Sequence, residues 1–197
     1  MDKSLKPLLK KLEDSASDLE ISLYVVGGGL RNHWLDKPCT DLDFTCRGVT
    51  QLARRFAERI RRPCITLDDT PGRETLRVVV HKDSNFDFTE LQGKTIEEDL
   101  AQRDFTINAM AQPLSGFLAG RTEYHDPHGG RRDLEKRLIR ANPGPVLRAD
   151  PLRLLRAFRF AATLGFEIEA DTLAQITRFK EGINRVAVER ILHELIL

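Results

Sequence analysis

The stretch VVGGGLRNHWLDKPCTDLDFTC, residues 25–46, contains an apolar run, three consecutive glycines, a helix-like segment and two aspartates. ISLYVV at 21–26 and LDFTC at 42–46 each have the short apolar character of a buried strand. Glycines between a strand and a helix predict a tight turn whose free N–H groups can accept a phosphate. Arg31, in the first helical turn, would add a positive charge.

The glycines do not complete either of two common phosphate-binding motifs. A dinucleotide fingerprint requires a third glycine where Asn32 stands, and a P-loop ending in GKT at 93–95 would need glycine in place of Phe88. An ordinary strand-to-helix connection and a phosphate site therefore both remain open. If the site exists, Gly27 and Gly28 are its backbone contacts.

Asp41 and Asp43 lie two positions apart, and alternate side chains of a strand point to the same face. Adjacent carboxylates repel one another unless a cation lies between them, and hard ions such as Mg²⁺ prefer carboxylate oxygens. Asp87, in the alternating SNFDFTE of residues 84–90, could join them from a neighbouring strand. The alternative is an exposed strand edge with solvated acids. Beside the glycine turn, the pair favours phosphoryl or nucleotidyl transfer.

The rest of the chain predicts an α+β fold. Apolar residues four apart indicate an amphipathic helix over 50–61, and CITL at 64–67 with TLRVVVH at 75–81 suggests a hairpin. After about residue 97 the patterns become mostly helical. We therefore expect a small mixed sheet followed by a helical segment from about residue 150.

Composition narrows the class of protein. A chain of 197 residues with 41% hydrophobic content can form one domain or two small ones. The net charge of +1 argues against an indiscriminate nucleic-acid binder. Residues 131–197 nevertheless hold 13 Lys and Arg against 9 Asp and Glu, while the earlier part has 18 against 21. That asymmetry suits metal chemistry beside a polyanion groove, and a chance distribution on a solvated surface explains it equally well.

Cysteine usage and hydropathy indicate the compartment. Cys39, Cys46 and Cys64 are odd in number and lack CxxC spacing, which favours reduced thiols in a cytoplasmic protein. The N-terminus has no signal-peptide pattern, and no apolar run reaches the ~18 residues of a membrane span. We therefore expect no membrane partner.

Several motifs, in order, carry a resemblance to a known family. GGGLRN followed by DLD resembles the opening signature of the DNA-polymerase-beta-like nucleotidyltransferase superfamily. QRDFTINAMA at 102–111 resembles the RRDFTINAMA motif of bacterial class II tRNA nucleotidyltransferases (CCA-adding enzymes) and their poly(A) polymerase relatives. DPHGGRRDLEKRLIR at 126–140 and ADPLRLLRAFRFAATLGF at 149–166 are similar to the next two motifs, and VAVERILHEL at 186–195 to the neck helix.

The resemblance implies a polymerase-beta-like nucleotidyltransferase head over 1–140 and an all-helical neck over 141–197. The last apolar stripe runs to Leu197 without a capping residue, so we expect body and tail domains beyond it. The implied reaction adds CCA, or only CC or only A, to a tRNA 3′ end from CTP and ATP, releasing pyrophosphate with two Mg²⁺ ions. The oligomeric state is left open.

Two alternatives remain beside this reaction. A poly(A) polymerase could be built on the same head. A degenerate, non-catalytic RNA-binding module is the other, and its only indications are Asn32 and Ala149, which stand where the family usually has Asp and Glu.

The acids and arginines can be assigned roles from this resemblance and from their chemistry. Asp41 and Asp43 would hold the metal, and Asp87 would assist. Arg103 suits a triphosphate, and the neighbouring Asp104 could accept from a ribose 2′-OH or form a structural ion pair.

Asp150 and Arg153 are the candidates for reading the base. Asp followed by Pro151 is also what a helix start prefers, so capping alone would explain that pair. An Asp acceptor beside an Arg donor matches the base edges of cytosine and adenine, and the resemblance assigns this role to the two residues. Arg156, one turn further on, is expected at the triphosphate.

Overall fold

The computed structural model describes residues 5–196, which form two compact units. The first unit comprises residues up to 100 together with 110–125, and the second comprises 101–109 and the residues from 126 onward. Compactness thus groups 126–140 with the later helices rather than with the sheet. A functional division into head and neck after residue 140 stays a prediction.

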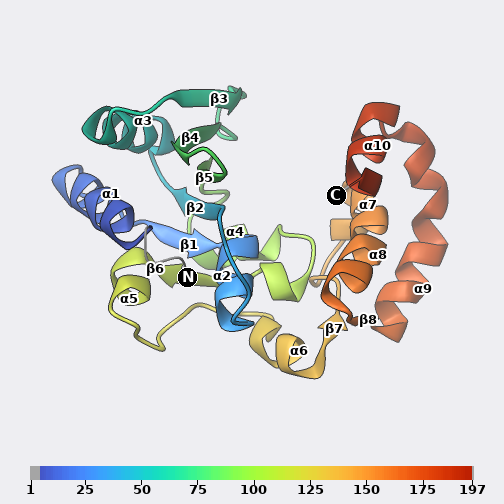
Figure 1. The fold of residues 1–197 in the computed structure, drawn as a ribbon. Helices are drawn as coiled ribbons and strands as arrows, with labels where there is room; N and C mark the ends of the chain where they lie inside the picture. Colours follow the sequence, from blue (N-terminus) through green and yellow to red (C-terminus); the bar gives the residue numbers. More distant parts are fainter. Residues whose placement is uncertain (1–4, 197) are drawn as a thin grey trace. The chain divides into compact units, whose positions relative to one another are not determined.

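A six-stranded mixed sheet forms the first unit, with strand order β3-β4-β5-β2-β1-β6 (Figure 1). The pairing of β2 with β5 is parallel, and the other pairings in this sheet are antiparallel. The strands are β1 (Tyr24–Val26), β2 (Leu42–Cys46), β3 (Cys64–Asp68), β4 (Thr75–His81), β5 (Ser84–Glu90) and β6 (Ala111–Pro113). The small mixed sheet of the predicted α+β fold is therefore confirmed.

Helices pack against this sheet. The amphipathic helix α3 lies against β3, β4 and β5, and α1 packs on α3 and α5, while α2 contacts β1, β2 and β6. The helices of this part are α1 (Lys6–Asp18), α2 (Gly27–Trp34), α3 (Val49–Ile60), α4 (Ile96–Ala101) and α5 (Leu114–Leu118).

An aromatic cluster between α3 and the sheet determines which way β2 and β5 face. Phe44, Phe86 and Phe88 are at most 1% exposed, and the Phe44 ring centroid lies 5.2 Å from each of the other two. Phe56 of α3 stacks on Phe86 at 5.8 Å. Burying each phenyl group stabilises the fold by roughly 1.5–3 kcal/mol. A one-residue slip of either strand would expose these rings, so the register is strongly specified.

The second unit is mainly helical. Its regular elements after residue 125 are α6 (Gly130–Lys136), β7 (Leu138–Ile139), α7 (Val146–Ala149), α8 (Leu152–Leu164), β8 (Glu167–Ile168), α9 (Ala170–Phe179), a 3-10 turn at Lys180–Arg185 and α10 (Val188–Ile196). β7 and β8 form a short parallel pair, and α10 packs on α8. No helix in residues 5–196 is long and apolar enough to span a bilayer.

The aromatic cluster generates a stability prediction. Phe86→Ala should lower the free energy of unfolding by about 3–5 kcal/mol, because it leaves a cavity between α3 and the sheet. Urea denaturation measures this change. Leu67→Ala, on the edge strand β3 and 51% exposed, is the control and should change stability by less than about 0.5 kcal/mol. Equal losses in the two variants would contradict this account of the register.

Candidate functional site

The three glycines form the first turn of α2, directly after β1. Gly27 has φ +64°, a conformation that favours glycine. A Cβ on Gly29 would lie 2.7 Å from Leu42 Cδ2 and 3.3 Å from the Asp41 carbonyl oxygen. Only glycine at this position lets α2 approach β2 so closely. The helix N-terminus and the aspartate strand are thereby held side by side.

A hydrogen bond joins the glycine turn to the carboxylates. Gly28 N–H donates to Asp43 Oδ2 at 3.2 Å. A Cβ on Gly28 would lie 3.7 Å from that same oxygen and 3.5 Å from Arg31 Nη2. The predicted phosphate contacts and the predicted metal ligand therefore belong to one cluster.

Arg31 lies within this cluster and is 8% exposed. Its Nε and Nη2 donate to Asn32 Oδ1 at 3.2 and 3.1 Å. Asn32 thus still supplies an acceptor oxygen to the arginine, although the negative charge of the family's usual aspartate is missing. Asparagine at position 32 therefore removes a negative charge from the turn but still orients Arg31 by hydrogen bonds.

Asp41 precedes β2 and is oriented by the start of β5. Its Oδ1 accepts hydrogen bonds from Asn85 N at 2.8 Å and from Asn85 Nδ2 at 3.3 Å. The sequence analysis did not identify Asn85. Its contact arises from the parallel pairing of β2 with β5, and residue spacing carries no signal for that pairing.

Asp87 lies directly opposite Asp43 in the β2–β5 ladder, so the two side chains share a face of the sheet. On the other side of Asp87, its partner in β4 is Arg77. Arg77 Nε and Nη2 donate to Asp87 Oδ1 and Oδ2, each at 2.7 Å, in a bidentate ion pair. Arg77 is a further residue that the sequence analysis missed.

The cluster has a negative electrostatic field. The hydrogen bond to Asp87 raises the pKa of Arg77 against the opposing effect of burial, and the charges of Asp87, Asp41 and Asp43 raise it further. Burial first, and then the charges of Asp43 and Asp41, raise the pKa of the Cys39 thiol to about 11. The thiol is therefore protonated at neutral pH, and the field favours cations.

The donor set fits a hard divalent ion bound together with a phosphate ligand. Within residues 5–196 no three His, Cys, Asp or Glu side chains form a group that could hold a metal ion. One or two carboxylates are nevertheless what Mg²⁺ commonly takes from a protein when water and substrate phosphates complete its octahedron. The two carboxylates of Asp41 and Asp43 would meet that requirement.

The remaining predicted residues lie in the second unit, where Asp104 and Arg156 form an ion pair. Asp104 is 6% exposed, and its Oδ2 accepts from Arg156 Nε at 2.8 Å. Its Oδ1 accepts from Phe105 N at 2.7 Å and from Asn108 Nδ2 at 3.0 Å. Burial alone would raise the pKa of Asp104, but the charge of Arg156 and these hydrogen bonds lower it. With both oxygens engaged, the ion-pair interpretation is favoured over a ribose contact.

The side chains of Asp150 and Arg153 are not paired with each other, although Arg153 N donates to the Asp150 carbonyl at 3.0 Å. Asp150 Oδ1 accepts from Leu152 N at 3.2 Å, and its Oδ2 lies 3.4 Å from Arg190 Nη2. Arg153 Nη1 donates to the Val146 carbonyl at 3.3 Å. The carboxylate therefore contributes to the start of α8, and in the described part of the chain Arg153 Nε and Nη2 have no hydrogen-bond partner.

A buried glutamate of α10 supports α8. Glu194, which is 4% exposed, pairs with Arg159 Nε and lies 3.8 Å from Arg156 Nη1. The sequence analysis placed this residue in the motif at 186–195 without assigning it a role. The backbone carbonyl of Arg103 accepts a hydrogen bond from Asn142 Nδ2 at 3.1 Å.

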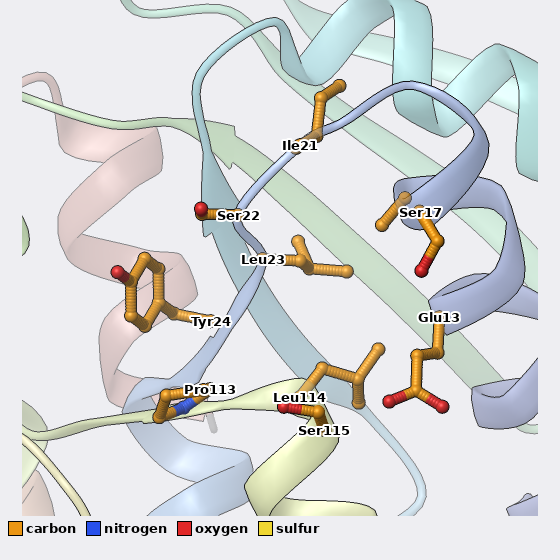
Figure 2. A pocket seen from close by; sticks show the side chains of 10 residues that line it. Glu13, Ser17, Ile21, Ser22, Leu23, Tyr24, Pro113, Leu114 and Ser115 are labelled. Atoms are coloured by element: carbon orange, nitrogen blue, oxygen red, sulfur yellow. The ribbon is translucent and has the colours of Figure 1, made fainter.

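The pocket in Figure 2 lies at another part of the first unit, where the end of α1, the start of β1 and the β6–α5 junction meet. Its volume is about 360 Å³, and Glu13 and Tyr24 are its titratable side chains. Tyr24 stands at the opposite end of β1 from the glycines. None of the predicted site residues lines this pocket.

Comparisons with known proteins identify the family. A model described as the poly(A) polymerase head domain matches residues 23–140, and one described as the probable RNA and SrmB-binding site of polymerase A matches 165–196. A CC-adding tRNA nucleotidyltransferase of Geobacter sulfurreducens is 43% identical over 87% of this chain and 39% of that protein. A multifunctional CCA protein of Pseudomonas aeruginosa is 37% identical over 82% of this chain and 40% of that protein.

Solved structures agree with these relatives. A CCA-adding enzyme in complex with ATP aligns with a TM-score of 0.86 at 28% identity, over 99% of this chain and 46% of that one. The Thermotoga maritima CCA-adding enzyme complexed with tRNA aligns with a TM-score of 0.84 at 28% identity, over 99% and 47%. This chain spans about two fifths of the length of the curated relatives it matches. The resemblance seen in the motifs is confirmed, and the chain belongs to the poly(A) polymerase head domain family.

Proposed function

We propose that the chain carries the nucleotidyl-transfer head of a tRNA nucleotidyltransferase. The 3′-OH of the tRNA attacks the α-phosphate of CTP, or of CTP and then ATP. A new O–P bond forms, the bond to the β-phosphate oxygen breaks, and pyrophosphate leaves. The observation that carries the proposal is the Gly28 N–H to Asp43 hydrogen bond, which joins a helix N-terminus to a carboxylate pair.

The first unit has the groups that this reaction needs. Mg²⁺ held by Asp41 and Asp43 would supply positive charge at the attacking oxygen and at the phosphate. The first turn of α2 offers backbone N–H groups and a favourable dipole to the triphosphate. Arg31, held by Asn32, adds a guanidinium beside the same turn. Binding, orientation and charge compensation would therefore come from neighbouring residues.

The second unit would supply base selection and further phosphate contacts. Asp150 accepts from the exocyclic amino group of cytosine or adenine, and Arg153 donates to the adjacent ring nitrogen through a nitrogen that is unpartnered in the described residues. Asp104 acts through Arg156, whose guanidinium it holds for the triphosphate. Arg103 joins the triphosphate contacts. We further infer a cytoplasmic enzyme, in keeping with three free thiols.

The comparisons favour addition of C or CCA to tRNA over synthesis of a poly(A) tail. Relatives at 35–43% identity are named for CC addition and relatives at 37% for CCA synthesis. The intact carboxylate pair argues against a degenerate RNA-binding module, as does Asn32, which still accepts a hydrogen bond from Arg31.

Incubating the full-length protein with a tRNA lacking its CCA end, and with each labelled NTP separately, tests the reaction. We expect incorporation of C, followed by A only if the enzyme synthesises all of CCA. Asp41→Asn and Asp43→Asn should each lower incorporation by on the order of 10³-fold, because each removes charge that binds the metal. Their circular dichroism spectra should match the wild type.

Three outcomes would reject this function. Long A tails on unrelated RNA would indicate a poly(A) polymerase. RNA binding without incorporation would indicate a non-catalytic module. Activity of both aspartate variants within about tenfold of the wild type would remove the metal site from the mechanism.

Base selection gives a separate prediction. CTP should bind more tightly than UTP. Uracil is the same size as cytosine, but its donor and acceptor positions are reversed. An unmet polar group typically costs about 1–3 kcal/mol, so Arg153→Ala should reduce the CTP/UTP affinity ratio by roughly tenfold. Calorimetric titration of each nucleotide measures this ratio.

Arg148→Ala is the matched control for Arg153→Ala. It removes the same charge from an exposed position on α7, five residues earlier in the chain, and should leave the CTP/UTP ratio unchanged. An Arg153→Ala variant that still discriminates like the wild type would show that another residue reads the base.

A further inference from the structure

Asp87 is the third carboxylate on the acidic face of the sheet, and Arg77 engages both of its oxygens. The two hydrogen bonds are each 2.7 Å long. The side chain of Asp87 is 21% exposed, and that of Arg77 is 38% exposed. The side chain of Arg77 is therefore fixed by a carboxylate at both Nε and Nη2. Nothing in the proposed reaction yet accounts for this pair.

The guanidinium has an unused edge. Nε and Nη2 bind Asp87, and within residues 5–196 Arg77 Nη1 has no hydrogen-bond partner. An arginine held in this way is preorganised, because its side-chain freedom has already been lost before a ligand arrives. Its three remaining N–H groups, two on Nη1 and one on Nη2, suit the oxygens of a phosphate.

The position of Arg77 places that edge beside the proposed metal ligands. Arg77, Asp87 and Asp43 are consecutive cross-strand partners in β4, β5 and β2, so their side chains share one face. Two strand spacings separate the backbones of Arg77 and Asp43, roughly 10 Å. An arginine side chain covers much of that span, and the charges of Asp41 and Asp43 act on this guanidinium.

We propose that Asp87 is a positioning residue rather than a metal ligand, and that it holds Arg77 to bind a phosphate group of the substrate. This inference rests on the proposed function, because it takes Asp41 and Asp43 as the metal ligands. For Asp87 to bind metal, it would have to release two charge-assisted hydrogen bonds and leave a partly buried guanidinium unpaired. A phosphate, in contrast, can bind Arg77 while the ion pair stays intact.

Charge supports a phosphate as the ligand. A divalent cation at the neighbouring aspartates would add positive charge near the remaining N–H groups of Arg77, and this charge favours an anion as their ligand. Substrate phosphates are the anions that accompany the metal in nucleotidyl transfer. They come from two sources, the triphosphate of the incoming nucleotide and the last phosphodiester of the RNA, and separate titrations distinguish these.

The test compares metal binding with ligand binding in full-length protein. Mn²⁺ binding is followed by electron paramagnetic resonance without nucleotide, and CTP and tRNA lacking its CCA end are titrated separately. Asp87→Asn should leave Mn²⁺ affinity within about threefold of the wild type. Arg77→Met should raise it severalfold, because it frees Asp87 to join the metal site.

Ligand binding should respond in the opposite way. Arg77→Met and Asp87→Asn should each weaken binding of the same ligand, CTP or tRNA, by roughly tenfold. The double variant should be no weaker than Arg77→Met, since the two residues act as a unit. Arg59→Met is the matched control, because it breaks an arginine–aspartate pair to Asp18, 2.6 Å long, on α3 and α1. It should change none of these affinities.

Two results would overturn the proposal. Loss of Mn²⁺ affinity in Asp87→Asn comparable to that of Asp43→Asn would make Asp87 a ligand. Unchanged CTP and tRNA binding in Arg77→Met would remove Arg77 from phosphate binding. Failure of the proposed function is recognised separately, because Asp43→Asn would then retain Mn²⁺ binding whatever Arg77 does.

Discussion

The parallel pairing of β2 with β5 is the constraint on which the site depends. It sets Asp43 opposite Asp87 on one face of the sheet and Phe44 opposite Phe88 on the other. The phenyl rings are buried against α3, and this burial makes a shifted register costly. The acids therefore stay on the face opposite the phenyl rings, because the aromatic residues that alternate with them are held in the core. Repulsion between the carboxylates is offset by hydrophobic burial and by neighbouring donors.

These donors determine what each acid can do. Gly28 N–H binds Asp43, Asn85 binds Asp41, and Arg77 binds Asp87 through both oxygens. These donors to Asp43 and Asp41 are neutral groups of the backbone and an amide, which orient a carboxylate without removing its charge. The guanidinium of Arg77 neutralises Asp87, so this third carboxylate serves to position Arg77. Three aspartates that look alike in sequence thus differ in chemistry through their partners.

The local patterns predicted much of this arrangement. The apolar run at 42–46 and the alternation at 84–90 indicated two strands, and the spacing of Asp41 and Asp43 indicated that they share a face. The glycines next to these aspartates indicated a shared site. The roles of Asn85 and Arg77 could not be predicted, because they depend on which strands are neighbours. The irregularity between Val79 and His81 also shifts the β4–β5 register, and no residue pattern indicates that shift. Asp104 appeared as a ligand contact or an ion pair, and only its burial against Arg156 separates the two.

The central claim is that Asp41 and Asp43 hold the metal while Asp87 stays with Arg77. Anomalous diffraction from crystals of the protein grown with Mn²⁺ and CTP would test it most directly. We expect a manganese peak within about 2.2 Å of oxygens of both Asp41 and Asp43, with the Arg77–Asp87 ion pair intact. A peak bound by Asp87 with Arg77 displaced, or a nucleotide-bound crystal with no peak at the Asp41–Asp43 pair, would contradict the account.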